Sequence, residues 1–389
     1  MDHILVIGGG VAGDAVADTL RSQGFAGRVT LVGSEPNPPY DRPPLSKQLL
    51  AGLWEPARLT LRKHDHYAVQ GIEIILGVAA TNLDTGRRRV HFDNGLELPY
   101  DGLVIATGVI PRELPIARGL RGVHTLRSVF DALALRSVLE GCQRVVVIGA
   151  GFVGTEVAAT VRSRGLEVAL VDIEDQPLQG ALGSRIGGLV GELHRKQGVR
   201  LLMGSSVREI GSIDGRATCV VLDDGRELPA DCVVVAIGAT PATAWLEGCG
   251  LRLQNGVACD EYGLAAPGIY AVGDVASWHI PRLGRAMRFE HRMNAVEQAT
   301  TAATNMVAPG TSRFVSVPFF WTDQFDARVQ AYGYPSADAE LHIAEGTVEE
   351  GRFVAVYSRH GEVVGVLGWN APKRLREHRA LLARSLATG

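Results

Sequence analysis

Cysteine is scarce in this chain, and its spacing excludes several kinds of redox and metal site. Only five of the 389 residues are cysteines, and no two of them form a CxxC or CxxxxC pair. Such pairs are the usual ligands of zinc and iron–sulfur clusters and the usual form of a catalytic dithiol. We therefore expect no metal site and no thiol relay. The cysteines are interpreted as structural thiols at Cys142, Cys219, Cys232, Cys249 and Cys259.

Net charge and long apolar runs are also lacking. A formal charge of −3 gives no electrostatic reason to expect a nucleic-acid partner. Glycines and charged residues interrupt every apolar run before it reaches the ~20 residues that a membrane helix needs. Because strand-like residues follow Met1 almost at once, we expect no signal peptide. These absences predict a cytoplasmic globular protein with no membrane partner, long enough for two or three domains.

What the chain does contain is glycine, placed in two motifs of one kind. GGGVAG at residues 8–13 follows the apolar run Ile4–Ile7, and GAGFVG at residues 149–154 follows Val145–Ile148. Each predicts a sharp turn from a strand into a helix whose free N–H groups face a pyrophosphate. Two such motifs predict two bound dinucleotides. The economical interpretation is one flavin and one nicotinamide, with a hydride passing between them.

Polar residues follow the next strand of each module, where a ribose-binding carboxylate is expected. After the predicted strand Val29–Val32 come Ser34 and Glu35. Either residue can contact the adenine ribose, and Glu35 in a solvated loop is the alternative. After Val168–Val171 comes Asp172, which can bind the ribose hydroxyls of NADH and would repel the 2′-phosphate of NADPH. The sequence therefore favours NADH.

A weak internal repeat supports two copies of one nucleotide-binding architecture. LPYDGLVIATG at residues 98–108 and LPADCVVVAIG at residues 228–238 each predict a buried strand that ends in glycine. Because one glycine motif precedes each strand, the second module is predicted to be inserted into the first.

A proline-rich stretch, PPYDRPPLSK at residues 38–47, predicts a stiff, extended connection. This stiffness would hold Arg42 and Lys47 against a diphosphate or a flavin edge, and Ser46 would cap the helix that follows. A generic proline loop is the alternative, and composition alone does not separate the two.

The last third of the chain offers one more candidate ligand and a further unit. Asp274, at a glycine turn, is expected either to bind a chain of hydroxyls such as the flavin ribityl or to cap a helix. The last part of the chain predicts a separate α+β unit of short strands. The aromatic run at its start, residues 319–321, is expected in the core rather than against a planar cofactor.

Seven motifs in order resemble the flavin-dependent ferredoxin reductases of bacterial oxygenase systems, the putidaredoxin reductase and Rieske dioxygenase reductase type. They are GGGVAG, YDRPPLSK, YDGLVIATG, VVVIGAGFVGTEVAA, YAVGDVA, EHRMNAVEQA and PFFWTDQF. The resemblance implies an α/β, glutathione-reductase-like fold that binds two dinucleotides. It implies an FAD-binding domain at 1–112 and 238–314, an NADH-binding domain at 113–237 and a C-terminal α+β interface domain at 315–389.

The resemblance also implies which residues touch each cofactor. For FAD these are Gly8, Gly10, Ala12, Gly13, Ser34, Glu35, Arg42, Lys47, Ala80, Thr107, Gly108, Arg127, Asp274, Glu290, His291, Arg292 and Trp321. For NADH they are Gly149, Gly151, Phe152, Val153, Gly154, Glu156, Asp172 and Gly238. Lys47 and Glu156 are expected to form a pair beside the flavin, with Lys47 an electrostatic partner rather than a proton donor.

Two positions depart from the family pattern. Ser34 stands where relatives usually carry an acid, and Arg292 stands where they often carry tryptophan, valine or histidine. An arginine at 292 is hypothesised to raise the flavin potential by stabilising the anionic reduced ring.

The expected activity is NADH-dependent reduction of a small, acidic iron–sulfur ferredoxin that supplies a P450 or Rieske oxygenase. We expect docking near Arg285 and Arg288, whereas the run from Lys373 to Arg379 is interpreted as a solvated face. A rubredoxin reductase and a flavoprotein like apoptosis-inducing factor, acting outside electron transfer, are the alternatives. Oxidases and peroxidases on this scaffold commonly use a first-domain cysteine, which this chain lacks.

Overall fold

The computed structural model describes residues 1–315 and 317–387 and comprises two compact units. Unit 1 contains residues 1–41, 59–110 and 240–318, and unit 2 contains residues 42–58, 111–239 and 319–389. The expected division into three domains remains a prediction.

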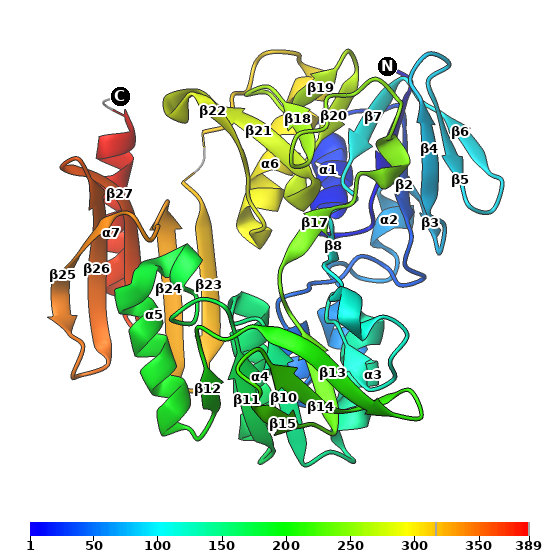
Figure 1. Cartoon of the computed structure of the whole chain (residues 1–389). Helices are drawn as coiled ribbons and strands as arrows, with labels where there is room; N and C mark the ends of the chain where they lie inside the picture. Colours follow the sequence, from blue (N-terminus) through cyan, green and yellow to red (C-terminus); the bar gives the residue numbers. More distant parts are fainter. Residues whose placement is uncertain (316, 388–389) are drawn as a thin grey trace. The chain divides into compact units, whose positions relative to one another are not determined.

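Unit 1 is built around a six-stranded sheet of order β19-β20-β7-β1-β2-β3. Its central strand, β1 (His3–Ile7), pairs in parallel with β2 (Arg28–Gly33) and β7 (Gly102–Ile105). Helix α1 (Val11–Ser22) packs on β1 and β2, and α6 (Arg292–Val307) lies beside it (Figure 1). A parallel strand that is covered on both faces reads as an unbroken apolar run, as β1 does.

The remaining elements of unit 1 are the short helix α2 and strands that complete this sheet or form two small sheets, β4-β5-β6 and β18-β21-β22. They are α2 (His66–Val69), β3 (Ile72–Leu76), β4 (Ala80–Asp84), β5 (Arg89–Phe92), β6 (Glu97–Pro99), β18 (Val257–Cys259), β19 (Leu264–Ala266), β20 (Ile269–Ala271), β21 (Ala276–Ile280) and β22 (Arg285–Arg288). Short 3₁₀ turns lie at η4 (Ala244–Leu246), η5 (Gly273–Val275) and η6 (Pro281–Leu283). Strands β8 (Val109–Pro111) and β17 (Ala239–Pro241) and the turn η2 (Pro56–Leu59) lie at the boundaries of the units.

Unit 2 repeats the strand–helix–strand core in a parallel sheet of order β12-β11-β10-β16-β9. Here β10 (Arg144–Ile148) pairs with β11 (Glu167–Val171) and β16 (Cys232–Val235), and α4 (Phe152–Ser163) joins the first two. The predicted second copy of the module is therefore present. Its other elements are η3 (Pro115–Ala117), β9 (Val123–His124), α3 (Val129–Leu139), β12 (Arg200–Leu202), β13 (Val207–Ile213), β14 (Arg216–Leu222) and β15 (Glu227–Pro229).

The repeated aspartates of the two modules explain part of the internal repeat. Asp101 accepts hydrogen bonds from the backbone N–H groups of Asp2 and His3 at 2.8 and 2.9 Å. Asp231 does the same for Gln143 and Arg144, at 3.0 and 2.8 Å. Each carboxylate thus ties the start of the first strand of its module to the start of the parallel strand beside it, β7 in unit 1 and β16 in unit 2. A further hydrogen bond, from the Arg144 guanidinium to Asp231 Oδ1 at 2.8 Å, is the main cause that lowers the pKa of Asp231 to about 2.

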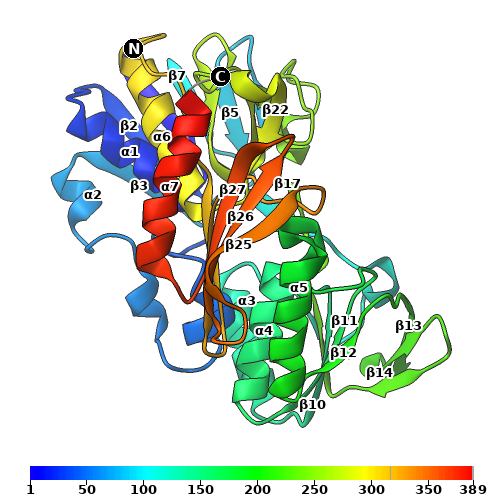
Figure 2. The same cartoon turned by 90° about the vertical axis from the view of Figure 1, so that its left-hand side faces the viewer.

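The C-terminal part of unit 2 is an antiparallel sheet of order β23-β24-β27-β26-β25. Its strands are β23 (Phe319–Gln324), β24 (Ala327–Gly333), β25 (Glu340–Thr347), β26 (Arg352–Arg359) and β27 (Glu362–Trp369). Helix α7 (Pro372–Ala387) runs along β27, as Figure 2 shows. Because side chains alternate along a strand, Leu367 and Trp369 point away from α7 while Gly368 faces it at Leu375.

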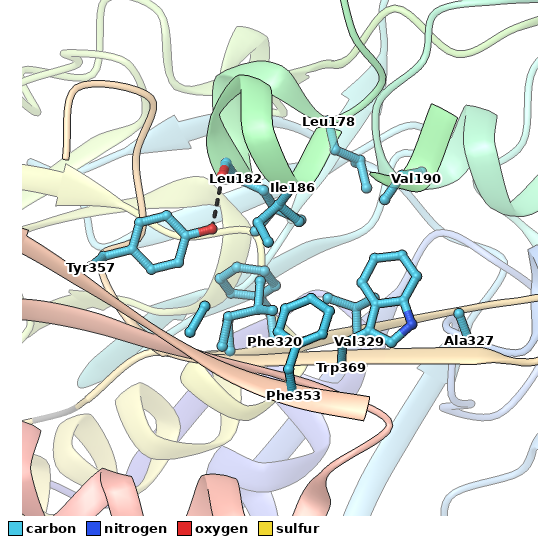
Figure 3. Packing of buried hydrophobic residues seen from close by; sticks show 13 residues of the cluster. Leu178, Leu182, Ile186, Val190, Phe320, Ala327, Val329, Phe353, Tyr357 and Trp369 are labelled. Carbon is cyan, nitrogen blue, oxygen red and sulfur yellow. Dashed lines mark hydrogen bonds between the residues drawn. The ribbon is translucent and has the colours of Figure 1, made fainter. Parts of the chain in front are cut away.

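The face of this sheet opposite α7 packs against α5 (Gln179–Lys196) in one apolar cluster (Figure 3). Leu182 and Ile186 of the helix meet Phe353 and Tyr357 of the sheet there. The helix bends at Gly183, whose φ of 78° is non-helical, and the Tyr357 hydroxyl donates to the Leu182 carbonyl at 2.8 Å. The strands and α5 therefore share a single core.

One expectation about local structure was wrong, and another was confirmed only for Phe320. Residues Leu45–Leu49 form a short π-helix that starts after Pro44, and Ser46 lies inside it rather than capping it. Of the aromatic run, Phe320 is in the shared core, but Trp321 lies on the other sheet face. There Trp321 stacks on Phe319 with ring centroids 5.9 Å apart, because neighbouring strand positions point to opposite faces.

No helix among the described residues combines the length and apolar character required to cross a membrane.

Candidate functional site

The first glycine motif forms an open anion-binding turn at the start of α1. Gly8 has a φ of 129° and packs against the backbone of Ala106, so a side chain at Gly8 would clash with it. Gly10 is the N-cap of α1, and no side chain of the described residues caps this end. A Cβ on Gly10 would meet no described atom within 4 Å. Free N–H groups facing open space fit the pyrophosphate of a dinucleotide.

The second motif repeats this geometry at the start of α4. Gly149 has a φ of 103° and packs on the backbone of Ala236, while Gly154 sits against the Gly149 carbonyl. The N-cap residue Gly151 again lacks a side-chain cap from the described part of the chain and faces open space. Phe152 and Val153 follow it; Phe152 packs edge-on against Phe320, with ring centroids 5.4 Å apart.

Asp172 lies at the end of β11 beside this second turn. Its carboxylate accepts hydrogen bonds from the backbone N–H groups of Ala150 and Glu174, the latter at 2.9 Å. A pocket opens next to it, lined by Ile173, Met203, Gly204, Ser205, Ser206, Leu222, Asp223, Asp224 and Arg226. Gly238, with a φ of 94°, leaves open space at the end of the module.

In unit 1, the residues that follow the second strand of the module differ from Asp172 of unit 2. Ser34, just after β2, is exposed, and the Glu35 carboxylate accepts a 2.6 Å hydrogen bond from the Tyr40 hydroxyl. The sequence offered Glu35, and more weakly Ser34, for a ribose contact, with Glu35 in a solvated loop as the alternative. Their roles remain predictions.

Unsatisfied polar groups gather near the N-terminus of α6, around Asp274 in η5. The Gln298 Oε1 accepts from the Gly273 N–H at 2.8 Å. Asn294 is only 1% exposed, yet neither of its amide atoms has a hydrogen-bond partner among the described residues. Buried polar groups normally pair, so this end of α6 fits a polar ligand such as the ribityl or pyrimidine part of a flavin. Burial lowers the pKa of His291 to about 4, against a smaller opposing effect from Asp274, so this residue is neutral at pH 7.

The other FAD candidates of unit 1 lie in β4 and after β7. Ala80 begins β4, where it pairs with Phe92. The Thr107 hydroxyl donates to the Ala242 carbonyl at 3.0 Å, and Gly108 has a φ of 72°. Ala12 and Gly13 lie buried in the first turn of α1.

The arginines after Asp274 do not share one role. Arg292 forms a 2.6 Å ion pair with Asp41. Arg288 donates to the Asp274 carbonyl at 3.1 Å and to the Glu290 carboxylate at 2.6 Å, and its side chain is 11% exposed. Arg288 is thus largely buried and already paired, and its predicted docking role remains a prediction. Arg285, on the same strand, is exposed.

Unit 2 contains a second, buried charged cluster centred on Glu156 of α4. Lys47 Nζ lies 2.8 Å from Glu156 Oε2, and the two side chains are 11% and 8% exposed. The predicted pair is thus confirmed, while its place beside the flavin remains a prediction. The Ser46 hydroxyl also donates to Glu156, at 2.5 Å. Arg42 and Arg127 lie together as well, with Arg42 donating to the Arg127 carbonyl at 2.6 Å.

Sequence reasoning missed the partners of Glu156 on strand β23. The Thr322 hydroxyl donates to Glu156 Oε1 at 2.8 Å, and Gln324 contacts Thr322 in turn. A period-two reading of PFFWTDQF places Phe320, Thr322 and Gln324 on one face, and this signal could have identified both polar residues.

Comparison with known proteins identifies the family to which this chain belongs. A model described as pyridine nucleotide-disulphide oxidoreductase matches residues 2–303, and one described as reductase C-terminal matches residues 319–388. The chain belongs to the pyridine nucleotide-disulphide oxidoreductase family. The predicted α/β fold with two dinucleotide-binding modules and a C-terminal α+β segment is confirmed.

Members of this family resemble the chain over nearly its full length. Rhodocoxin reductase of Rhodococcus erythropolis is 37% identical, and the alignment covers 98% of this chain and 90% of the rhodocoxin reductase chain. The benzene 1,2-dioxygenase system ferredoxin–NAD(+) reductase subunit of Pseudomonas putida is 35% identical, and the alignment covers 96% of this chain and 90% of that subunit. The crystal structure of the covalent putidaredoxin reductase–putidaredoxin complex matches with a TM-score of 0.93 and 33% identity, over 98% and 92%.

Despite the family name, this oxidoreductase carries no vicinal dithiol. All five cysteines are free, and four of them are buried. Burial raises the pKa of Cys232 to about 12 and also raises the pKa values of Cys142 and Cys259. Such thiols are poor nucleophiles at neutral pH.

Proposed function

We propose that this protein is an NADH-dependent ferredoxin reductase that carries FAD. The observation that carries the proposal is the pair of uncapped, open helix N-termini at Gly10 and Gly151, one in each module. Relatives named as reductases of rhodocoxin and of ferredoxin support it, because they align over almost the whole chain. The downstream oxygenase, of the P450 or Rieske type, belongs to the same proposal.

Separate groups of residues hold the two cofactors. When bound, FAD accepts a hydride from NADH and releases electrons singly to an iron–sulfur protein. The α1 end at Gly10 holds its pyrophosphate, and Asp274 and Asn294 bind its polar groups. The α4 end at Gly151 holds the pyrophosphate of NADH. Glu156, with Lys47 as its electrostatic partner, orients the nicotinamide, and positioning of this kind supplies most of the catalysis in a hydride transfer.

Preference for NADH follows from the charge at the end of β11. Asp172 and Glu174 are both acidic, so a 2′-phosphate would meet repulsion where ribose hydroxyls find an acceptor. Arg226, in the adjoining pocket, is engaged by Asp224, its Nε lying 2.6 Å from Asp224 Oδ2. It is therefore not a free cation for a 2′-phosphate.

An acidic ferredoxin is the proposed partner, docking on the exposed arginines Arg282 and Arg285. The structure of a putidaredoxin reductase bound to putidaredoxin supports an iron–sulfur partner of this kind. Arg285→Glu should weaken ferredoxin reduction while NADH-driven dye reduction persists. Lys373→Glu on α7 is the matched control, because the same charge change there should leave both activities intact. Equal loss in the two variants would argue against the docking site.

Anaerobic stopped-flow titration of the FAD-loaded protein tests the whole proposal. We expect fast bleaching of the flavin by NADH, slow bleaching by NADPH and rapid reoxidation by a ferredoxin. Reoxidation by rubredoxin alone would instead favour a rubredoxin reductase. Slow reduction with a long-lived charge-transfer complex would favour a role like that of apoptosis-inducing factor. A cytoplasmic location completes the proposal, since five free cysteines suit a reducing compartment.

A further inference from the structure

A chain of buried hydrogen bonds leads from Glu156 into strand β23 and ends on helix α5. Lys47 and Ser46 both approach Glu156 Oε2, and Thr322 alone donates to Oε1 among the described residues. The Gln324 amide nitrogen lies 3.1 Å from the Thr322 hydroxyl. The two carboxylate oxygens are therefore held from different sides, one by the segment 46–47 and one by β23.

The hydrogen bonds of this network can run in only one direction. The Thr322 hydroxyl gives its single proton to Glu156, so it must accept from the Gln324 amide. The second N–H of that amide reaches the Thr155 hydroxyl at 2.8 Å, and Thr155 donates to the Gly151 carbonyl at 2.9 Å. One amide thus connects the Glu156 carboxylate with the glycine turn that opens α4.

The hydrogen bond at the other end of the network, between Gln324 and His194, is equally constrained. The Gln324 amide oxygen lies 2.8 Å from His194 Nε2, and because that oxygen can only accept, His194 carries its proton on Nε2. Burial lowers the pKa of His194, which keeps the ring neutral. Its Nδ1 has no hydrogen-bond partner within the described part of the chain.

Burial makes this arrangement rigid. Thr322, Gln324, Thr155 and His194 are exposed by 1%, 3%, 0% and 0%, so solvent cannot replace a lost partner. A buried polar group that loses its partner costs free energy, so the network has one favoured geometry. A residue that contacts no cofactor can therefore fix the direction of the Glu156 carboxylate.

We propose that Thr322 and Gln324 of the C-terminal strand β23 are positioning residues for hydride transfer, and that they act through Glu156. The inference rests on the proposed function, in which Glu156 orients the nicotinamide of NADH. It assigns to the C-terminal segment a part in the NADH half-reaction, separate from any contact with an electron acceptor.

Thr322→Val tests this role, because it removes the hydroxyl and preserves the shape of the side chain. Stopped-flow reduction of the FAD-loaded protein measures the NADH dissociation constant and the limiting rate of flavin bleaching separately. We expect the limiting rate to fall about 10- to 100-fold, the usual effect of losing a hydrogen bond to a charged group, with a smaller change in NADH affinity. Thr322→Ser, which restores the hydroxyl, should return to within about threefold of the wild-type rate.

A double-mutant cycle with Glu156→Gln separates positioning from a general structural effect. If Thr322 acts through Glu156, Thr322→Val should change the rate less than about twofold in the Glu156→Gln background. An equal loss in both backgrounds, or a wild-type rate in the single variant, would overturn the inference. If Thr322→Val does not fold, a Thr322→Ser protein as slow as Glu156→Gln would overturn it instead. Failure of NADH to bleach the wild-type flavin would refute the proposed function, so the two failures are distinguishable.

Discussion

Replacing Lys47 by methionine measures how the buried carboxylate of Glu156 is stabilised. Methionine keeps the length of the side chain and removes the ammonium group, which lies 2.8 Å from Glu156 Oε2. Deleting one partner of a buried ion pair costs about 3–5 kcal/mol, because the remaining charge is left uncompensated. Ser46 and Thr322 would still donate to the carboxylate. We therefore expect a loss near the lower limit, about 3 kcal/mol in the free energy of unfolding.

Urea unfolding of the FAD-loaded protein, followed by circular dichroism, is the appropriate assay. A shift of the midpoint at an unchanged slope converts directly into a free-energy difference. The double variant Lys47→Met with Glu156→Gln leaves no unpaired charge, so it should recover at least about half of the loss. A Lys47→Met protein within about 0.5 kcal/mol of the wild type would refute the reasoning. Strictly additive losses in the double variant would refute it as well.

Four further results are expected. Asp172→Asn removes the charge that faces a 2′-phosphate, so the ratio of kcat/KM for NADH over NADPH should fall about tenfold or more; an unchanged ratio would exclude Asp172 from coenzyme selection. Gly10→Val fills the open turn, so circular dichroism should show a folded protein that has lost FAD, and retained yellow colour would contradict this. The pKa of His291 is lowered from 6.5 to about 4 in the folded protein. As the pH falls from 6.5 to 4, the unfolded chain therefore binds this proton before the folded protein does, and the free energy of unfolding decreases. His291→Asn should remove up to about 1.4 kcal/mol per pH unit of this pH dependence, measured by urea titrations. Tyr357→Phe removes the hydroxyl that donates to the Leu182 carbonyl and should cost about 1–3 kcal/mol by urea midpoint, whereas no change would show that the hydroxyl is dispensable.

The two nucleotide-binding modules could be predicted because each rule involved is local. An apolar run such as Ile4–Ile7 marks a strand covered on both faces, and the glycine motif after it marks a turn in which side chains at Gly8 and Gly13 would clash with the backbone. The bend of α5 at Gly183 had no such signal, since a glycine inside a helical pattern is usually tolerated without a break. The π-helix after Pro44 was missed because its hydrogen bonds depend on tertiary packing.

The candidate site could be predicted less completely. The Lys47–Glu156 pair came from the family resemblance, because charges so far apart in the sequence meet only through the fold. For the same reason Ser46 was assigned to a cap when its hydroxyl binds Glu156. Arg288 was expected on the surface because a run of arginines usually is, but its side chain is largely buried and donates to a backbone carbonyl and to Glu290. Composition gives a residue's chemistry, whereas its partners depend on long-range packing.

The core shared by α5 and the C-terminal sheet limits how proteins of this architecture can be recombined. Without α5, the strands would expose the side chains around Phe353 and Tyr357 to water. A chimera that exchanges only residues 319–389 would pair a foreign sheet with a helix shaped for the original one. An exchange that moves α5 together with the sheet keeps their interface intact, so the smallest transferable piece of this protein is discontinuous in sequence.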